Sequence, residues 1–197
     1  MKIVCMAVPA RAGIVDYLRK HIPGLEVVWD KKRYAPDTWM RSLEQIDNAV
    51  GGAIIEDDIV LTKGFYEKIQ QEVQKRPKDF IQFFTRRKED VASGSRYKTG
   101  RSFTNSPCVY YPPGSAAELI QYAENHPRWT TDPTGYDLLI SDYLTEKRLK
   151  YWIVVPNIVD HLSLVSAIDP RRSKNRKSTT FCNPELEGLP SADLPKR

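Results

Sequence analysis

Three consecutive carboxylates follow a short apolar run, and this arrangement constrains the fold more than any other stretch. The run Ala53 to Ile55 leads directly into Glu56, Asp57 and Asp58, after which apolar residues resume. The pattern predicts a buried strand with the acids at its carboxyl end. Strand alternation then places Glu56 and Asp58 on one face of the strand and Asp57 on the other.

Three adjacent acids are unfavourable at the end of a buried strand. Adjacent carboxylates repel one another, and an apolar environment raises their pKa values. A divalent cation would remove both penalties, because hard oxygen ligands suit Mg²⁺ or Mn²⁺. A solvated acidic turn is the simpler alternative, but the apolar residues on both sides of the acids favour a metal site.

The length and composition are typical of one soluble globular domain. The chain has 197 residues, of which 41% are hydrophobic and 28% charged, which is enough for one sizeable core. No apolar run approaches the ~20 residues of a transmembrane helix, so no membrane span is expected. The three cysteines fit neither a disulfide framework nor a zinc pattern. A reducing cytoplasm is therefore expected, with Cys5 and Cys108 packed as small hydrophobic residues.

Strands and helices are expected to alternate along the first part of the chain. The expected elements are strands at 2–8, 25–29 and 53–55, and helices at 12–21 and from Asp37 or Thr38 to Val50. This order predicts an α/β fold with a Rossmann-like, mixed and mostly parallel sheet, flanked by helices in a single domain. Ligands of such sheets bind at the carboxyl ends of the strands.

The rest of the chain continues this pattern around one long basic stretch. The expected elements are strands at 80–84, 107–111 and 149–155, and helices that begin after Thr62, at Ser115 with Glu118 in a capping box, and at Asp132-Pro133. Residues 86–105 are expected to form a long loop with a functional role. Residues 1–166 should form the domain, and residues 167–197 a basic, extended or partly disordered tail.

Positive charge is concentrated in two short segments. The net charge is +5, whereas residues 86–101 carry +4 and residues 171–177 carry +5, which leaves −4 for the rest. Such segments are usually solvated, but they are also what a polyanionic partner requires. Tyr97 and Phe103 could stack on a nucleic-acid base. The candidate nucleic-acid-binding residues are Arg86, Arg87, Lys88, Arg96, Tyr97, Lys98, Arg101, Arg171, Arg172 and Lys174.

The strand that ends in Glu56-Asp57-Asp58 resembles the metal-binding motif of GT-A glycosyltransferases, in which a strand ends in an acid-x-acid motif. The resemblance covers roughly residues 2–166. It implies that Mn²⁺ or Mg²⁺ bridges the diphosphate of a nucleotide-sugar donor, with a UDP-sugar expected. By this resemblance Asp58 is the metal ligand, Glu56 contacts the ribose or the metal and its water shell, and Asp57 is a supporting acid.

Two later passages extend the resemblance. The stretch from Pro156 to His161 is similar to the ending of several GT-A families, which implies that His161 ligates the metal or touches the diphosphate. An acid near the start of the late helix meets the acceptor hydroxyl in that family, so Asp137 is the candidate base and Asp142 the second choice. The alternatives are a structural histidine, and an acid that the helix macrodipole favours.

The first two strand ends are expected to hold the nucleotide. By the resemblance, Val8, Pro9 and Arg11 cradle the base. Asp30 would contact the base or the ribose, and Arg41 would reach the base or a phosphate. The simpler alternatives are a surface charge at a helix start for Arg11, a loop cap for Asp30 and a solvated helix face for Arg41.

The predicted function is metal-dependent transfer of a sugar from a nucleotide-sugar to an acceptor hydroxyl. Chain size and basic segments favour DNA carrying a hydroxylated pyrimidine, as in small bacteriophage glycosyltransferases, which would act in the host cytoplasm. A saccharide acceptor is the alternative, as in lipopolysaccharide-type transferases with a similar Glu-Asp-Asp strand. Two other classes stay open: a nucleotide-binding module without catalysis, and a nucleotidyltransferase, for which Val8 to Gly13 forms a poor phosphate loop.

Overall fold

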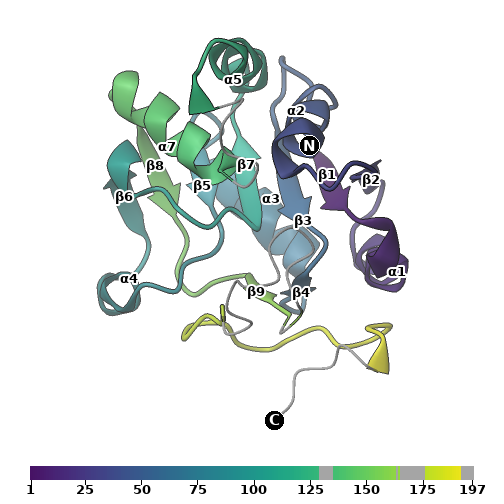
Figure 1. The fold of residues 1–197 in the computed structure, drawn as a ribbon. Helices are drawn as coiled ribbons and strands as arrows, with labels where there is room; N and C mark the ends of the chain where they lie inside the picture. The colour runs from purple at the N-terminus through teal and green to yellow at the C-terminus, as the bar shows by residue number, and fades with distance from the viewer. Residues whose placement is uncertain (129–134, 163, 165–175, 192–197) are drawn as a thin grey trace.

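A computed structural model of the chain describes residues 1–128, 135–162, 164 and 176–191 (Figure 1). Its centre is a seven-stranded sheet in the order β2-β1-β3-β7-β5-β8-β6. The strands are β1 Lys2–Ala7, β2 Glu26–Trp29, β3 Gly52–Glu56, β5 Phe80–Gln82, β6 Arg96–Thr99, β7 Cys108–Tyr111 and β8 Lys150–Ile153. Strands β2, β1, β3, β5 and β8 point the same way, and β7 and β6 run against them. This arrangement confirms the predicted α/β fold with a mixed, mostly parallel sheet.

Helices pack on both faces of this sheet. The helices are α1 Ala12–His21, α2 Ala35–Leu43, α3 Phe65–Lys75, α4 Lys88–Ser93, α5 Ser115–Glu124 and α7 Tyr136–Glu146. Side chains of α1 and α3 share one core cluster with Ile3 and Cys5, whereas those of α2, α5 and α7 share another with Val4 and Met6. Alternate residues of β1 therefore enter different cores, as expected for a strand that is buried on both faces. No helix among the described residues is long and apolar enough to cross a membrane.

A separate two-stranded sheet lies next to the carboxyl end of β3. Strands β4 Ile59–Leu61 and β9 Val159–His161 pair antiparallel, with Ile59 opposite His161. The backbone N–H of Leu162 donates to the carbonyl of Asp58 at 2.7 Å, which extends this pairing toward β3. The apolar pattern predicts neither strand, because each has three residues and its partner lies far along the chain. This pairing carries His161 to the acidic strand end.

The basic stretch 86–105 is more structured than the loop that its composition predicts. It contains α4, the edge strand β6 and the 3-10 turn Gly100–Ser102. The prediction is wrong because two of its cations, Arg96 and Lys98, pair with the buried carboxylate of Asp90 and fix the segment on the body. Gly100 is needed where the turn meets α7, since a Cβ there would lie 2.6 Å from backbone atoms of Leu144.

Several expected helix ends are also wrong. Helix α2 ends at Leu43 rather than Val50, because the Asp47 side chain accepts a hydrogen bond from the Ala49 N–H at 2.8 Å and forms a turn. The Thr62 hydroxyl donates to the Cys182 carbonyl instead of capping α3, and Gly64 precedes that helix with φ of 68°.

Helix α5 begins at Ser115, as predicted, but without the predicted capping box. The Ser115 hydroxyl donates to the Pro112 carbonyl at 2.7 Å, and the Glu118 carboxylate accepts from the Tyr143 hydroxyl at 2.6 Å, so these residues form no capping box. Helix α7 begins at Tyr136, and the expected cap at Asp132-Pro133 lies outside the described residues.

Residues 176–191 of the C-terminal segment run along β4 and onto α1 (Figure 1). The Lys63 N–H donates to the Asn183 carbonyl at 2.9 Å, and the Glu185 N–H donates to the Leu61 carbonyl at 2.7 Å. The Leu189 side chain is buried in the same core cluster as α1. This segment therefore forms the outer edge of the β4–β9 sheet and lies close to the strand that carries His161.

Candidate metal and substrate site

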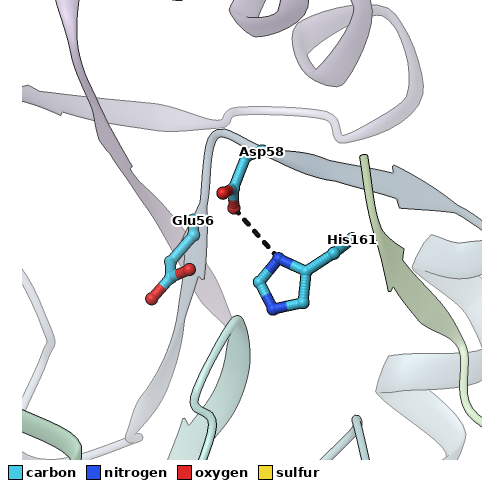
Figure 2. A group of neighbouring side chains, drawn as sticks. All are labelled: Glu56, Asp58 and His161. Carbon is cyan, nitrogen blue, oxygen red and sulfur yellow. Dashed lines mark ion pairs between the residues drawn. The ribbon is translucent and has the colours of Figure 1, made fainter. Parts of the chain in front are cut away.

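Glu56, Asp58 and His161 converge where β3, β4 and β9 meet (Figure 2). One ligand atom from each of the three residues lies within 4.8 Å of the others. Asp58 and His161 are 4% and 2% exposed, and Asp58 Oδ1 lies 3.3 Å from His161 Nδ1. The structure therefore places together the three side chains that were expected to ligate a metal.

Two of these ligand atoms have no hydrogen bond within the described part of the chain. Asp58 Oδ1 and His161 Nδ1 are both buried and both unsatisfied there, whereas buried polar atoms normally have a partner. Adjacent ligands at about 2.0–2.1 Å from an octahedral metal lie roughly 3 Å apart, which is close to the observed 3.3 Å. The donor set therefore fits a small divalent cation, and its two carboxylates favour Mg²⁺ or Mn²⁺.

The second oxygen of Asp58 faces two guanidinium groups. Arg176 lies 2.8 Å from Asp58 Oδ2, and Arg11 lies 3.6 Å from the same atom. Burial alone would raise the pKa of Asp58, but His161, Arg11 and Arg176 together hold it well below its ordinary value. Asp58 is therefore ionised, which is the form that binds a metal.

Glu56 accepts a hydrogen bond from the hydroxyl of Tyr136, the first residue of α7. Burial and then the nearby Asp58 charge raise the pKa of Glu56, and burial also raises the pKa of Tyr136 well above its ordinary value. The phenol therefore stays protonated and orients the Glu56 carboxylate. A bound cation would favour the ionised form of Glu56, because an opposite charge lowers a carboxyl pKa.

Asp57 points to the other side of the strand end, as the alternation predicts. Its carboxylate accepts hydrogen bonds from the Val8 N–H at 2.7 Å and from the Arg11 guanidinium at 2.6 Å. Burial raises the pKa of Asp57 to about 6, in spite of Arg11. Asp57 thus fixes the turn Pro9–Arg11 that follows β1, and this turn is where base binding was expected.

The two other expected nucleotide contacts have partners of their own beyond β2. Asp30 accepts hydrogen bonds from the backbone N–H groups of Lys32 and Tyr34, at 3.0 and 3.1 Å. Arg41 pairs with Asp37 at 2.9 Å and donates to a backbone carbonyl at 3.1 Å. These contacts are those of a loop cap and a helix face, and neither residue lines the pocket beside the acids.

A pocket of about 710 Å³ opens beside the metal-ligand candidates. Its lining residues are Glu56, Arg86, Arg87, Thr104, Asn105, Ser106, Tyr136, Asp137, His161 and Arg176. Tyr136 is not among the expected site residues, and Arg176 is expected only as one of the DNA-binding cations of residues 171–177. No local pattern in the sequence places either residue at this pocket. The pocket brings segments from six parts of the chain to one place, so only the fold could identify it.

Of the two candidate bases, Asp137 lies in this pocket with Glu56 and His161. Its Oδ2 accepts a hydrogen bond from the Asn105 N–H at 3.3 Å, and its Oδ1 accepts from the Leu138 N–H at 3.0 Å. Asp142 is instead paired with Arg128 at 3.0 Å and is not a pocket residue. The geometry therefore favours Asp137 over Asp142.

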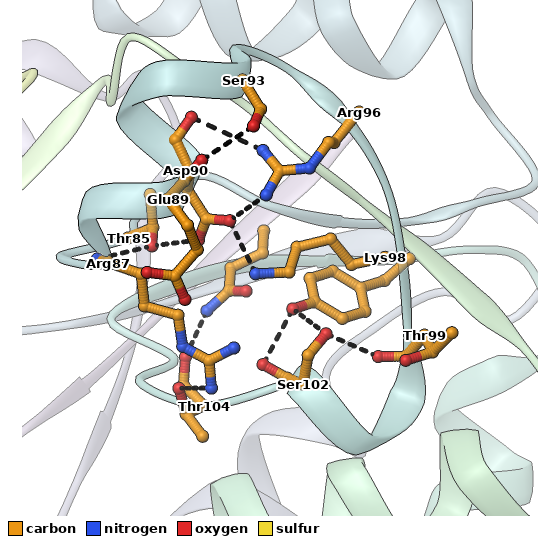
Figure 3. Close-up of polar contacts among 12 residues, drawn as sticks. Thr85, Arg87, Glu89, Asp90, Ser93, Arg96, Lys98, Thr99, Ser102 and Thr104 are labelled. Atoms are coloured by element: carbon orange, nitrogen blue, oxygen red, sulfur yellow. Dashed lines mark hydrogen bonds and ion pairs between the residues drawn. The ribbon is translucent and has the colours of Figure 1, made fainter.

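The basic residues of segment 86–101 divide into groups with different surroundings. Arg86 and Arg87 line the pocket, whereas Arg96 and Lys98 each lie 2.6 Å from Asp90 Oδ1 (Figure 3). Lys88 and Arg101 are exposed, and Arg171, Arg172 and Lys174 lie outside the described residues. The segment thus does not present its charges as one surface.

The two aromatic side chains of this segment also have packing partners. Phe103 is fully buried against Tyr151, with ring centroids 5.1 Å apart, so it cannot stack on a base. Tyr97 is 49% exposed, but its ring packs against Trp152 at 5.0 Å and its hydroxyl donates to Asp79 at 2.6 Å. The expectation for Phe103 is wrong, because its apolar ring belongs to the core.

Comparison with known proteins bears on the fold. No protein-family model and no curated protein matches the chain. A solved structure titled "Crystal Structure of A197 from STIV" is similar, with a TM-score of 0.50 and 12% identity over 88% of this chain and 92% of that chain. At this identity the likeness concerns the fold alone, and the α/β arrangement described above is shared with that protein.

Proposed function

We propose that this protein is a metal-dependent glycosyltransferase that uses a nucleotide-sugar donor. The observation that carries the proposal is the convergence of Glu56, Asp58 and His161 beside a pocket that also contains Asp137. The same residues carry the resemblance to GT-A glycosyltransferases. A divalent metal bound by the three ligands would neutralise the negative charge that develops on the leaving diphosphate.

The chain's own side chains would divide the remaining work. Asp58 and His161 present unsatisfied atoms toward the metal position, and the Tyr136 hydroxyl orients Glu56. Asp137 would accept the proton of the acceptor hydroxyl while that oxygen bonds to the sugar and the bond from the sugar to the diphosphate breaks. The Asn105 N–H holds the Asp137 carboxylate in position for this transfer.

We propose DNA carrying a hydroxylated pyrimidine as the acceptor. Arg86 and Arg87 support this choice, because both guanidinium groups line the pocket that contains Asp137. Arg96 and Lys98 do not support it, since the buried Asp90 carboxylate already pairs with them. The DNA would then be bound near the pocket rather than along the whole basic segment, and a saccharide acceptor is the competing outcome.

The donor is tested by thermal denaturation with a panel of nucleotide-sugars, with and without Mn²⁺. A ligand that binds the folded state raises the melting temperature by mass action, so one donor should stabilise the protein in the presence of Mn²⁺. Asp58→Asn should lose this shift. Stabilisation by nucleoside triphosphates alone would instead indicate a nucleotidyltransferase, and no shift with any nucleotide would refute the proposal.

The acceptor is tested by DNA binding at increasing salt. Binding through phosphates weakens with a slope near −0.9 per neutralised phosphate on duplex DNA, so the double variant Arg86→Gln/Arg87→Gln should flatten the slope by about 2. A matched loss of two exposed cations on α1, Arg19→Gln/Lys20→Gln, should leave it unchanged. If the wild-type protein shows no salt-dependent binding even at low salt, the saccharide acceptor replaces DNA.

A further inference from the structure

Arg176 reaches the metal-ligand candidates from the C-terminal segment. Its terminal nitrogen lies 2.8 Å from Asp58 Oδ2, and its side chain is 15% exposed. Its Nε is buried and donates to no residue that the structure describes. A buried guanidinium N–H without a hydrogen-bond acceptor is costly. The placement of Arg176 therefore suits a ligand that enters the pocket and accepts this hydrogen bond.

The backbone beside Arg176 is fastened to the strand that carries His161. The Lys177 ammonium donates to the His161 carbonyl at 2.5 Å, and the Ser178 N–H donates to Asp160 Oδ1 at 2.8 Å. The Asn157 side chain adds a hydrogen bond to the Ser178 hydroxyl at 2.8 Å. Arg176 is therefore held in a fixed position relative to the candidate ligand His161.

The charges of the pocket indicate what kind of ligand Arg176 would bind. Three guanidinium groups and two carboxylates line the pocket, and Asp58 supplies a further negative charge beside Arg176. A divalent cation on Asp58 would take over the charge compensation that Arg176 now gives and would repel its guanidinium. The excess positive charge would then suit an anion that also binds the metal.

We infer that Arg176 pairs with Asp58 in the metal-free protein and with a phosphate oxygen of the donor diphosphate once the metal is bound. This inference rests on the function proposed above. A guanidinium suits the second role, because its fixed fork of donors matches phosphate oxygens. The Nε–H of Arg176, which has no hydrogen bond to a described residue, would donate to a phosphate oxygen of the diphosphate.

The two roles predict opposite changes in two affinities when the guanidinium is removed. In calorimetric titrations, Arg176→Met should bind Mn²⁺ alone several-fold more tightly than wild type, because a competing cation is gone. The same variant, saturated with Mn²⁺, should bind a nucleoside diphosphate at least about 10-fold more weakly, as expected for a lost charge-assisted hydrogen bond. The probes are UDP, GDP, CDP and ADP, each titrated separately.

Two further variants control for charge and for folding. Arg176→Lys keeps the charge and loses the fork, so its Mn²⁺ affinity should match wild type and its diphosphate affinity should still fall. Arg19→Met, which removes an exposed arginine from α1, should change neither affinity.

Three results would overturn the inference. Equal diphosphate binding by Arg176→Met and wild type would do so, and so would a fall of both affinities together with a lower melting temperature. If wild type binds none of the four diphosphates with Mn²⁺, the proposed function itself fails, and the inference fails with it.

Discussion

Asp58 and Asp90 are both buried carboxylates beside cations, but their surroundings differ in completeness. Both oxygens of Asp90 are occupied (Figure 3): Oδ1 accepts from Arg96 and Lys98, each at 2.6 Å, and Oδ2 accepts from the Thr85 hydroxyl at 2.6 Å. A buried polar cluster in which every atom has a partner stabilises one conformation. The Asp90 cluster thus explains how a basic segment folds onto the body.

Only one of the two Asp58 carboxylate oxygens accepts a hydrogen bond from a described residue. Its Oδ2 accepts from Arg176, whereas its Oδ1 faces His161 Nδ1 (Figure 2) and neither atom has a hydrogen bond among the described residues. Sites where a protein leaves a local rule unmet are expected to be functional. Buried charge alone therefore does not distinguish the two carboxylates, whereas the buried atoms without a hydrogen bond beside Asp58 are what favours a metal site there.

The largest effect is expected for Asp58→Asn. The change removes a negative charge from the metal-ligand candidates, so Mn²⁺ affinity should fall by more than about 100-fold, beyond the range for disturbing a supporting group, and transfer should stop. The melting temperature should fall less than in Asp90→Asn, because the lost pairing with Arg176 is offset in part by relief of the repulsion from Glu56 and Asp57. Calorimetric titration measures the Mn²⁺ affinity, and thermal denaturation measures the melting temperature. Normal Mn²⁺ binding by this variant would mean that Asp58, like Asp90, is not a metal ligand.

The matched change at the complete cluster, Asp90→Asn, should have the reverse pattern. It leaves Arg96 and Lys98 without their anion, and breaking a buried pair costs about 3 kcal/mol when one partner stays partly solvated. Chemical denaturation should show this loss, while Mn²⁺ affinity of the folded protein stays at the wild-type value. Unchanged stability would mean that the Asp90 cluster does not stabilise the fold.

A smaller effect is expected for Asp137→Asn, which lies in the pocket but outside the metal-ligand candidates. The amide cannot accept the acceptor's proton, so turnover should fall by ~10²-fold or more, whereas Mn²⁺ and donor affinities should stay the same. Asp142→Asn serves as the control, because Asp142 lies outside the pocket. Normal turnover of Asp137→Asn together with a slow Asp142→Asn would exchange the two roles.

Mild acid should produce the smallest effect, and the Asp90 cluster should contribute to it. Burial alone would raise the pKa of Asp90, but hydrogen bonds from Lys98 and Thr85 hold it below its ordinary value. The unfolded chain therefore binds more protons in acid, so this stabilisation is present above about pH 4 and declines as the pH falls through the folded-state pKa. Denaturation curves of Asp90→Asn should depend less on pH in that range than those of wild type.

The sequence predicts the parallel half of the fold well because that half is built from local patterns. The elements from β1 to β3 each have an apolar periodicity, and their alternation implies a parallel sheet. The acids at the end of β3 are visible for the same reason. The β4–β9 pairing is not visible, because three-residue strands carry too little periodicity.

Composition was misleading where charges find partners inside the fold. The stretch 86–105 is rich in cations and glycine, so it resembles a solvated loop, but a single buried acid, Asp90, organises it. Arg176 has the same ambiguity, because a cation in a basic tail looks solvated until its distance to Asp58 is known. Pairings between distant segments decide both cases, and no local pattern encodes them.

Electron spin-echo spectroscopy of the Mn²⁺-loaded protein tests directly whether His161 binds the metal. The chain has three histidines, and we expect ¹⁴N modulation from one imidazole bound to the metal. The modulation should disappear in His161→Gln and persist in His21→Gln. Absence of ¹⁴N modulation in wild type, or its persistence in His161→Gln, would contradict a metal site formed by Glu56, Asp58 and His161.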